Sequence, residues 1–155
     1  MNAFAAGAVS AAMLLLLGAG AQFSPAQQPP AGTTETEETS MQIEILVNGQ
    51  SFPAELYDND SARELASRLP LELEMQELNG NEKYCYLDDS LPAHASRPGK
   101  IHAGDLMLFG SDCLVLFYES FSTSYSYTSL GAVENPRGLA DALGSGSVQV
   151  TLRLS

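Results

Sequence analysis

The sequence lacks tryptophan and contains only 7 lysines and arginines among 155 residues, against 19 aspartates and glutamates. The formal net charge is therefore −12. Residues 1–40 hold three of the acidic residues and no basic one, so the chain from Met41 onward keeps 16 acidic and 7 basic residues. This excess of negative charge repels polyanions, and no cluster of basic residues offsets it. We therefore expect neither nucleic acid nor an anionic membrane surface as a partner.

Cysteine and histidine are also scarce, with two residues of each. His94 and His102 match no zinc-ligand spacing, so we expect no metal site and no cofactor. No Gly-x-Ser-x-Gly turn accompanies the serines, and no catalytic residue is assigned. Cys85 and Cys113 lie in apolar stretches and are interpreted as free thiols. A disulfide between them is the alternative, because exported proteins can form disulfides.

The N-terminal 40 residues differ sharply in composition from the rest. Residues 3–21 carry no charge and end in Ala19-Gly20-Ala21, which predicts a signal peptide over residues 1–21, with a retained membrane anchor as the alternative. Residues 22–40 are rich in Pro, Gln, Thr and Glu and predict a disordered linker. A signal followed by a polar spacer predicts an extracytoplasmic protein, secreted or tethered at the outer face of the membrane. A true start at Met41 would remove this expectation.

Residues 41–155 contain many short strand patterns, and their length suits one domain with a single core. Asn48-Gly49 predicts a tight hairpin. Residues 113–118 are apolar at successive positions, as in a strand buried on both faces, whereas residues 71–78 alternate as in a half-solvated strand. The expected strands cover residues 41–47, 51–57, 71–78, 83–87, 105–109, 113–118, 129–133 and 147–154.

Two helices are expected between these strands. Ser61 and Glu64 fit a capping box at the start of the first helix, although Asn59 could cap it instead. The second helix has Asn135 as its N-cap and Gly144 at its C-terminal end. The apolar stripe of the first helix consists of Ala62, Leu65, Ala66 and Leu69.

An antiparallel sheet of so many short strands must close or pack on itself to remove its edges. Four segments are specific in combination: YDN at 57–59, LNGNEKY at 78–84, GDL at 104–106 and CLVLFY at 113–118. Together they resemble the bacterial cyclophilin-like domain, and the resemblance extends over residues 41–154. It implies a mainly β fold, a closed cyclophilin-like antiparallel barrel of about eight strands with two short helices. Members of this group largely lack an assigned activity.

The resemblance also bears on catalysis. Cyclophilins isomerise prolyl bonds with an arginine on a strand after the first helix, beside an apolar proline pocket. The matching strands of this chain, residues 71–78 and 83–87, contain no arginine, and Lys83 is a point charge without the planar guanidinium fork. We therefore expect a non-catalytic binding module, with a divergent peptidyl-prolyl isomerase as the alternative.

Residues 121–128, FSTSYSYT, have the most unusual composition in the domain. Their hydroxyls offer donors and acceptors, and their tyrosines offer flat apolar faces with a polar tip. We interpret the segment as the wall of a groove for a small polar ligand or an extended peptide. An ordinary strand and turn with a solvated face is the alternative. With neighbours taken from the family's recurring segments, the predicted binding residues are Glu82, Lys83, Tyr84, His102, Tyr118, Ser122, Thr123, Ser124, Tyr125 and Tyr127.

Overall fold

The computed structural model describes residues 39–155, and the predicted signal peptide and all but the end of the predicted linker lie outside the described residues. The described part begins with a hairpin of β1 (Met41–Val47) and β2 (Gln50–Leu56). Asn48 and Gly49 have φ angles of 48° and 76°, the left-handed pair that a two-residue hairpin turn requires. The predicted Asn-Gly turn is therefore confirmed.

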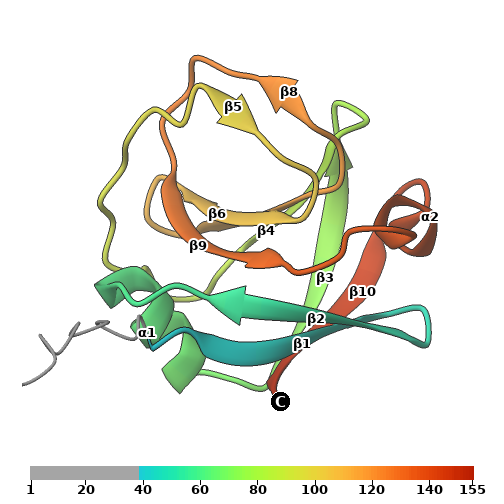
Figure 1. Cartoon of the computed structure of the whole chain (residues 1–155), viewed down its shortest axis with the longest axis horizontal. Coiled ribbons are helices and arrows are strands. Elements are labelled where there is room, and N and C mark those ends of the chain that lie inside the picture. The colour runs from blue at the N-terminus through green and yellow to red at the C-terminus, as the bar shows by residue number, and fades with distance from the viewer. Residues whose placement is uncertain (1–38) are drawn as a thin grey trace, which may run out of the picture. The chain divides into compact units, whose positions relative to one another are not determined.

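Eight antiparallel strands form a closed barrel in the order β1-β10-β3-β4-β7-β6-β9-β2 (Figure 1). Closure pairs both sides of every barrel strand and leaves no exposed edge. The predicted closed barrel is confirmed, and the two-stranded sheet of β5 and β8 was not foreseen. The remaining strands are β3 (Leu71–Leu78), β4 (Glu82–Tyr86), β5 (Lys100–Ile101), β6 (Asp105–Phe109), β7 (Cys113–Phe117), β8 (Phe121–Ser122), β9 (Thr128–Val133) and β10 (Val148–Leu154).

Helix α1 (Asp60–Ser67) is capped by Asn59, whose side chain accepts a hydrogen bond of 2.8 Å from the Ala62 amide. The capping box at Ser61 was therefore wrong and its alternative was right. Ser61 lies inside the helix, where its hydroxyl donates to the carbonyl of Pro92. This bond ties the helix to the long loop that follows β4.

Helix α2 (Leu139–Leu143) begins later than its sequence predicts. The Asn135 side chain accepts a hydrogen bond from the Arg137 amide and forms a turn instead of an N-cap. Gly138 then has a φ of 82°, a left-handed conformation that a right-handed helix cannot include, so the helix begins after it. The predicted end at Gly144 is confirmed.

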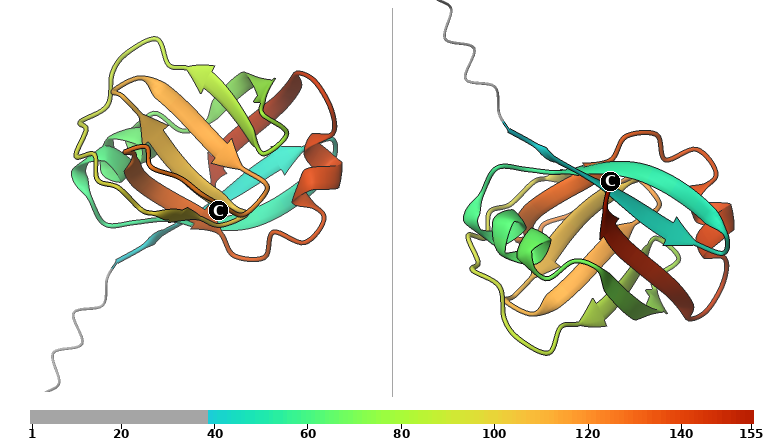
Figure 2. Two further views of the ribbon diagram at one scale, coloured as in Figure 1. Left: turned by 90° about the horizontal axis from the view of Figure 1, so that it is seen from above. Right: turned by 90° about the horizontal axis from the view of Figure 1, so that it is seen from below.

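Both helices pack apolar side chains into the barrel core, and Figure 2 shows them on opposite sides of the barrel. Leu65 of α1 and Leu139 of α2 are fully buried in it. No helix within residues 39–155 is long and apolar enough to cross a membrane.

Strand β7 separates two apolar layers. Leu114 and Leu116 point into the barrel core, whereas Cys113, Val115 and Phe117 point outward. All five are buried, as expected for a strand covered on both faces. The outward side chains join Ile101, Met107 and Tyr127 in a second cluster, called the outer core below.

The outer core is covered by the chain that runs from β8 to β9, called the strap (residues 121–127). β8 pairs with β5, and farther along Ser96 and Tyr127 exchange two backbone hydrogen bonds of 2.9 Å. Figure 1 shows β5 and β8 lying apart from the barrel strands on this side of the molecule. The outer face of the barrel sheet at β4 and β7, called the sheet side below, and the strap thus enclose a space outside the barrel.

Candidate functional site

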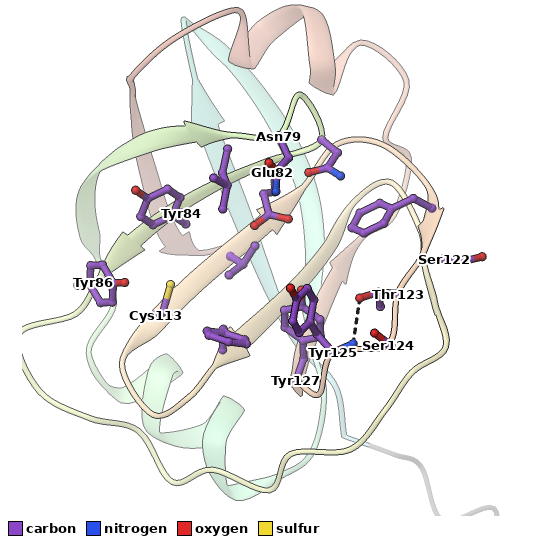
Figure 3. Close-up of a pocket in the computed structure, with 15 residues that line it drawn as sticks. Asn79, Glu82, Tyr84, Tyr86, Cys113, Ser122, Thr123, Ser124, Tyr125 and Tyr127 are labelled. Atoms are coloured by element: carbon purple, nitrogen blue, oxygen red, sulfur yellow. Dashed lines mark hydrogen bonds between the residues drawn. The ribbon is translucent and has the colours of Figure 1, made fainter.

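A groove of about 540 Å³ lies between the outer face of β4 and β7 and the strap (Figure 3). One end is bounded by the turn between β3 and β4, and the other by Tyr86 and Phe109. It is thus formed by segments far apart in the sequence. Its lining comprises Leu78, Asn79, Asn81, Glu82, Tyr84, Tyr86, Phe109, Cys113, Val115, Phe121, Ser122, Thr123, Ser124, Tyr125 and Tyr127.

Aromatic packing holds the strap against the sheet. The Tyr127 ring lies 5.5 Å from that of Phe117 and 5.7 Å from that of Phe109. At the other end of the strap, the Phe121 ring lies 5.6 Å from that of Phe117. Such edge-on and tilted pairs add attraction beyond burial of the rings. The wall of the groove is therefore anchored at both ends.

Exposed apolar side chains gather at the groove. Within residues 39–155, five large hydrophobic residues are exposed, and four of them line the groove. Because solvation of such side chains is unfavourable, their concentration at one concave site is typical of a binding surface. The four are Leu78, Tyr86, Phe109 and Tyr125, and the fifth, Leu154, lies elsewhere.

Glu82 contributes the one carboxyl group among the described residues that line the groove. It is only 8% exposed, and no described residue donates a hydrogen bond or forms an ion pair with its carboxyl group. Burial, and then the negative charge of Glu77, raises the pKa of Glu82. The groove thus contains a carboxyl group whose hydrogen-bonding capacity is unused.

Lys83 lies on the opposite face of β4, inside the barrel. Its ammonium group is fully buried and donates to the carbonyls of Gly144 (2.8 Å) and Gly146 (2.7 Å). It also pairs with the carboxylate of Glu77 at 2.7 Å. Lys83 therefore joins β4 to the chain after α2 and does not line the groove.

Glu77 connects Lys83 to Tyr118. Its carboxylate accepts hydrogen bonds from the Tyr118 hydroxyl (2.6 Å) and the Gly80 amide (2.9 Å) as well as pairing with Lys83. Burial alone would raise the pKa of Glu77, but the contacts with Lys83 and Tyr118 outweigh it and lower the pKa. Burial and the bond to Glu77 raise the pKa of Tyr118 to about 12. Tyr118 is thus occupied by Glu77 and does not line the groove.

His102 lies in the turn between β5 and β6, with an exposed side chain, and does not line the groove either. Its amide donates to Asp105, which fixes the turn. The structure thus brings together seven of the ten predicted binding residues and separates Lys83, His102 and Tyr118 from them. The seven are Glu82, Tyr84, Ser122, Thr123, Ser124, Tyr125 and Tyr127.

The prediction missed Tyr86 and Phe109, which form the far end of the groove. Strand alternation was the available signal for Tyr86, because residues 82, 84 and 86 must share one face of β4. Phe109 offered no such signal, since only the fold brings the end of β6 to the strap.

The two cysteines are free and buried, as predicted. Cys85 points into the barrel core and Cys113 into the outer core, so the sheet separates them. Burial raises the pKa of each thiol to about 11. Neither thiol is therefore a nucleophile at neutral pH.

The groove combines polar and aromatic side chains. Its lining contains hydroxyls, aromatic rings, amides and one carboxyl group, with no lysine, arginine or histidine. Residues 39–155 contain no cluster of three or more His, Cys, Asp or Glu side chains able to hold a metal ion. A smaller hollow of about 350 Å³ next to β3, called the acidic hollow, is lined by Arg68, Leu71, Glu72, Leu73, Glu74, Cys85, Tyr86, Leu87, Asp88 and Asp89.

Comparison with known proteins agrees with this architecture. Residues 45–153 match the model of the cyclophilin-like family. The solution structure of the hypothetical protein AF2241 from Archaeoglobus fulgidus is similar to this chain, with a TM-score of 0.52 and 17% sequence identity. The alignment covers 78% of this chain and 99% of that one. No curated protein matched. The family match spans more than half of the sequence, and the chain belongs to the cyclophilin-like family.

Proposed function

We propose that this chain is an extracytoplasmic binding module that holds a small polar ligand or an extended peptide in the groove between the sheet and the strap. The observation that carries the proposal is the gathering of four exposed large hydrophobic residues around this one concave site. Ser122, Thr123 and Ser124 add polar groups on the strap side. Apolar walls with a few polar groups are the usual composition of a ligand site.

The isomerase alternative requires a cation at the rim of an apolar proline pocket. No lysine or arginine lines the groove, and the Lys83 ammonium is held inside the barrel by Glu77 and two carbonyls. The arrangement therefore favours binding without catalysis.

NMR titration of the isotope-labelled full chain tests the proposal. We would add small polar fragments and capped tetrapeptides, both neutral and charged, and follow the backbone amides. Binding in the groove shifts the amides of residues 82–86 and 122–125. Tyr125→Ala should weaken the tightest probe about tenfold, because it removes an exposed aromatic contact. Leu154→Ala is the matched control, since it truncates an exposed side chain outside the groove.

The location is tested separately. If residues 1–21 are a signal peptide, protein recovered from its native host should begin at Gln22. N-terminal sequencing measures this, and full-length chain recovered from cytosol would overturn the extracytoplasmic assignment.

A further inference from the structure

We propose that the groove selects an organic cation, an ammonium or guanidinium group carried by a small molecule or by a peptide side chain, with Glu82 and Asn81 as its acceptors. The inference rests on the proposed function and specifies the chemistry of the ligand. It is argued from acceptors without a partner, from aromatic rings in the same groove, and from the lack of a lysine, arginine or histidine among the described residues that line it.

Two acceptors in the groove have no partner among the described residues. Glu82 is more than nine-tenths buried, yet its carboxyl group receives no hydrogen bond. Oδ1 of Asn81 is buried and likewise unpaired. A buried acceptor without a donor, such as Asn81 Oδ1, is costly, and the Glu82 carboxyl group accepts no hydrogen bond from the described residues, so a ligand that donates to both gains hydrogen bonds that a ligand without donors does not. Figure 3 shows Glu82 directed into the space between the sheet and the strap.

Aromatic rings line the same groove as these acceptors. Tyr84 and Tyr86 lie on the sheet side, with ring centres 6.1 Å apart and nearly perpendicular planes. Tyr125 and Tyr127 lie on the strap side, and Phe109 contacts both. The faces of such rings carry negative potential and attract ammonium and guanidinium groups, most strongly where water is excluded. A carboxylate among tyrosines therefore fits a cation better than an anion or a purely apolar group.

Among residues 39–155, no lysine, arginine or histidine lines the groove. The nearest basic residue in the sequence, Lys83, points to the other face of β4 and is paired with Glu77. Residues 41–155 carry nine more acidic than basic side chains, so the surrounding field also attracts positive ligands. Burial of Glu82 penalises its ionised form, and a bound cation would reverse that penalty.

Two pairs of probes test the proposal on the full chain by NMR titration or calorimetry. One pair is Nα-acetyl-arginine methylamide and its neutral isostere Nα-acetyl-citrulline methylamide, which represents a peptide source. The other pair is 2-phenylethylammonium and neutral 2-phenylethanol, which represents a small-molecule source. We expect at least one cation to bind about tenfold more tightly than its neutral partner.

Glu82→Gln should abolish that preference, because it removes the charge and keeps the shape. Glu134→Gln, on an exposed residue outside the groove, should preserve it. Equal binding of cation and isostere at the groove, or a preference that survives Glu82→Gln, would overturn the cation assignment while leaving the binding module intact. No shift in the groove with any probe, here or in the fragment titration, would overturn the proposed function itself.

Discussion

Two adjacent residues, Glu82 and Lys83, show how strand geometry sets different roles. Neighbouring side chains of a strand point to opposite faces, so one reaches the groove and the other the barrel core. Lys83 is paired with Glu77, whereas Glu82 has no partner among the described residues. The paired residue supports the fold, and the unpaired one is available to a ligand.

Glu82→Gln should stabilise the free protein near pH 7, and the gain should shrink toward pH 4. Burial and Glu77 raise the pKa of Glu82 in the folded state. Above the unfolded pKa of about 4.3, the folded state binds more protons than the unfolded state, and stability falls as pH rises. Below that pH both states are protonated and the cost disappears. Urea unfolding at both pH values, with Glu134→Gln as control, measures the effect; a gain that does not depend on pH would contradict it.

Lys83→Met should destabilise the protein by about 1–3 kcal/mol, because the carboxylate of Glu77, whose side chain is 28% exposed, loses its cation. The carbonyls of Gly144 and Gly146 lose their donor as well. The double variant Lys83→Met/Glu77→Gln should lose clearly less, since the uncompensated charge is gone. Equilibrium denaturation of both variants checks this. If both variants lost the same free energy of unfolding, the ion pair with Glu77 would not be the way in which Lys83 stabilises the protein.

At the scale of elements, β7 is the strand on which both apolar layers depend. Its run of consecutive apolar residues predicted burial on both faces, and that prediction is confirmed. The start of α2 was missed, because a backbone conformation at Gly138, and not a side-chain pattern, decides it. Lys83 and Tyr84 were both predicted to line the groove, although neighbouring side chains of a strand point to opposite faces. In the structure Lys83 lies opposite Leu116 of β7, whose side chain points into the barrel.

Leu116→Ala should lower stability by about 2–5 kcal/mol, the usual range for truncating a buried leucine. Leu116 is fully buried in the barrel core and pairs with both β4 and β6. The free energy of unfolding in denaturant measures the loss, with exposed Leu154→Ala as the reference substitution. A loss under about 1 kcal/mol, as surface changes give, would mean that the strand is wrongly placed.

For the whole molecule, the family resemblance predicted the closed barrel, and the composition of residues 121–128 predicted one wall of its groove. Period-two alternation and turn residues specify strands and hairpins locally. The groove required more, because Phe109, Tyr86 and the strap meet only through the order in which the strands close. Composition alone identified the strap, from the tyrosines and hydroxyls of residues 121–128.

The full chain should not accelerate cis–trans exchange in a short X-Pro peptide. Catalysis must lower a barrier of about 18–20 kcal/mol by binding the twisted amide selectively. The groove offers no lysine or arginine for that purpose. Exchange NMR measures the rate; strong acceleration that Tyr125→Ala abolishes would make the groove an active site and overturn the non-catalytic proposal.

The central claim is that ligands bind in the groove between the sheet and the strap. Intermolecular nuclear Overhauser effects from the tightest-binding probe test it most directly, because they report which side chains the probe contacts. We expect contacts to the rings of Tyr84, Tyr125 and Tyr127. Contacts confined to the side chains of the acidic hollow, such as Leu71 and Leu73, would contradict it.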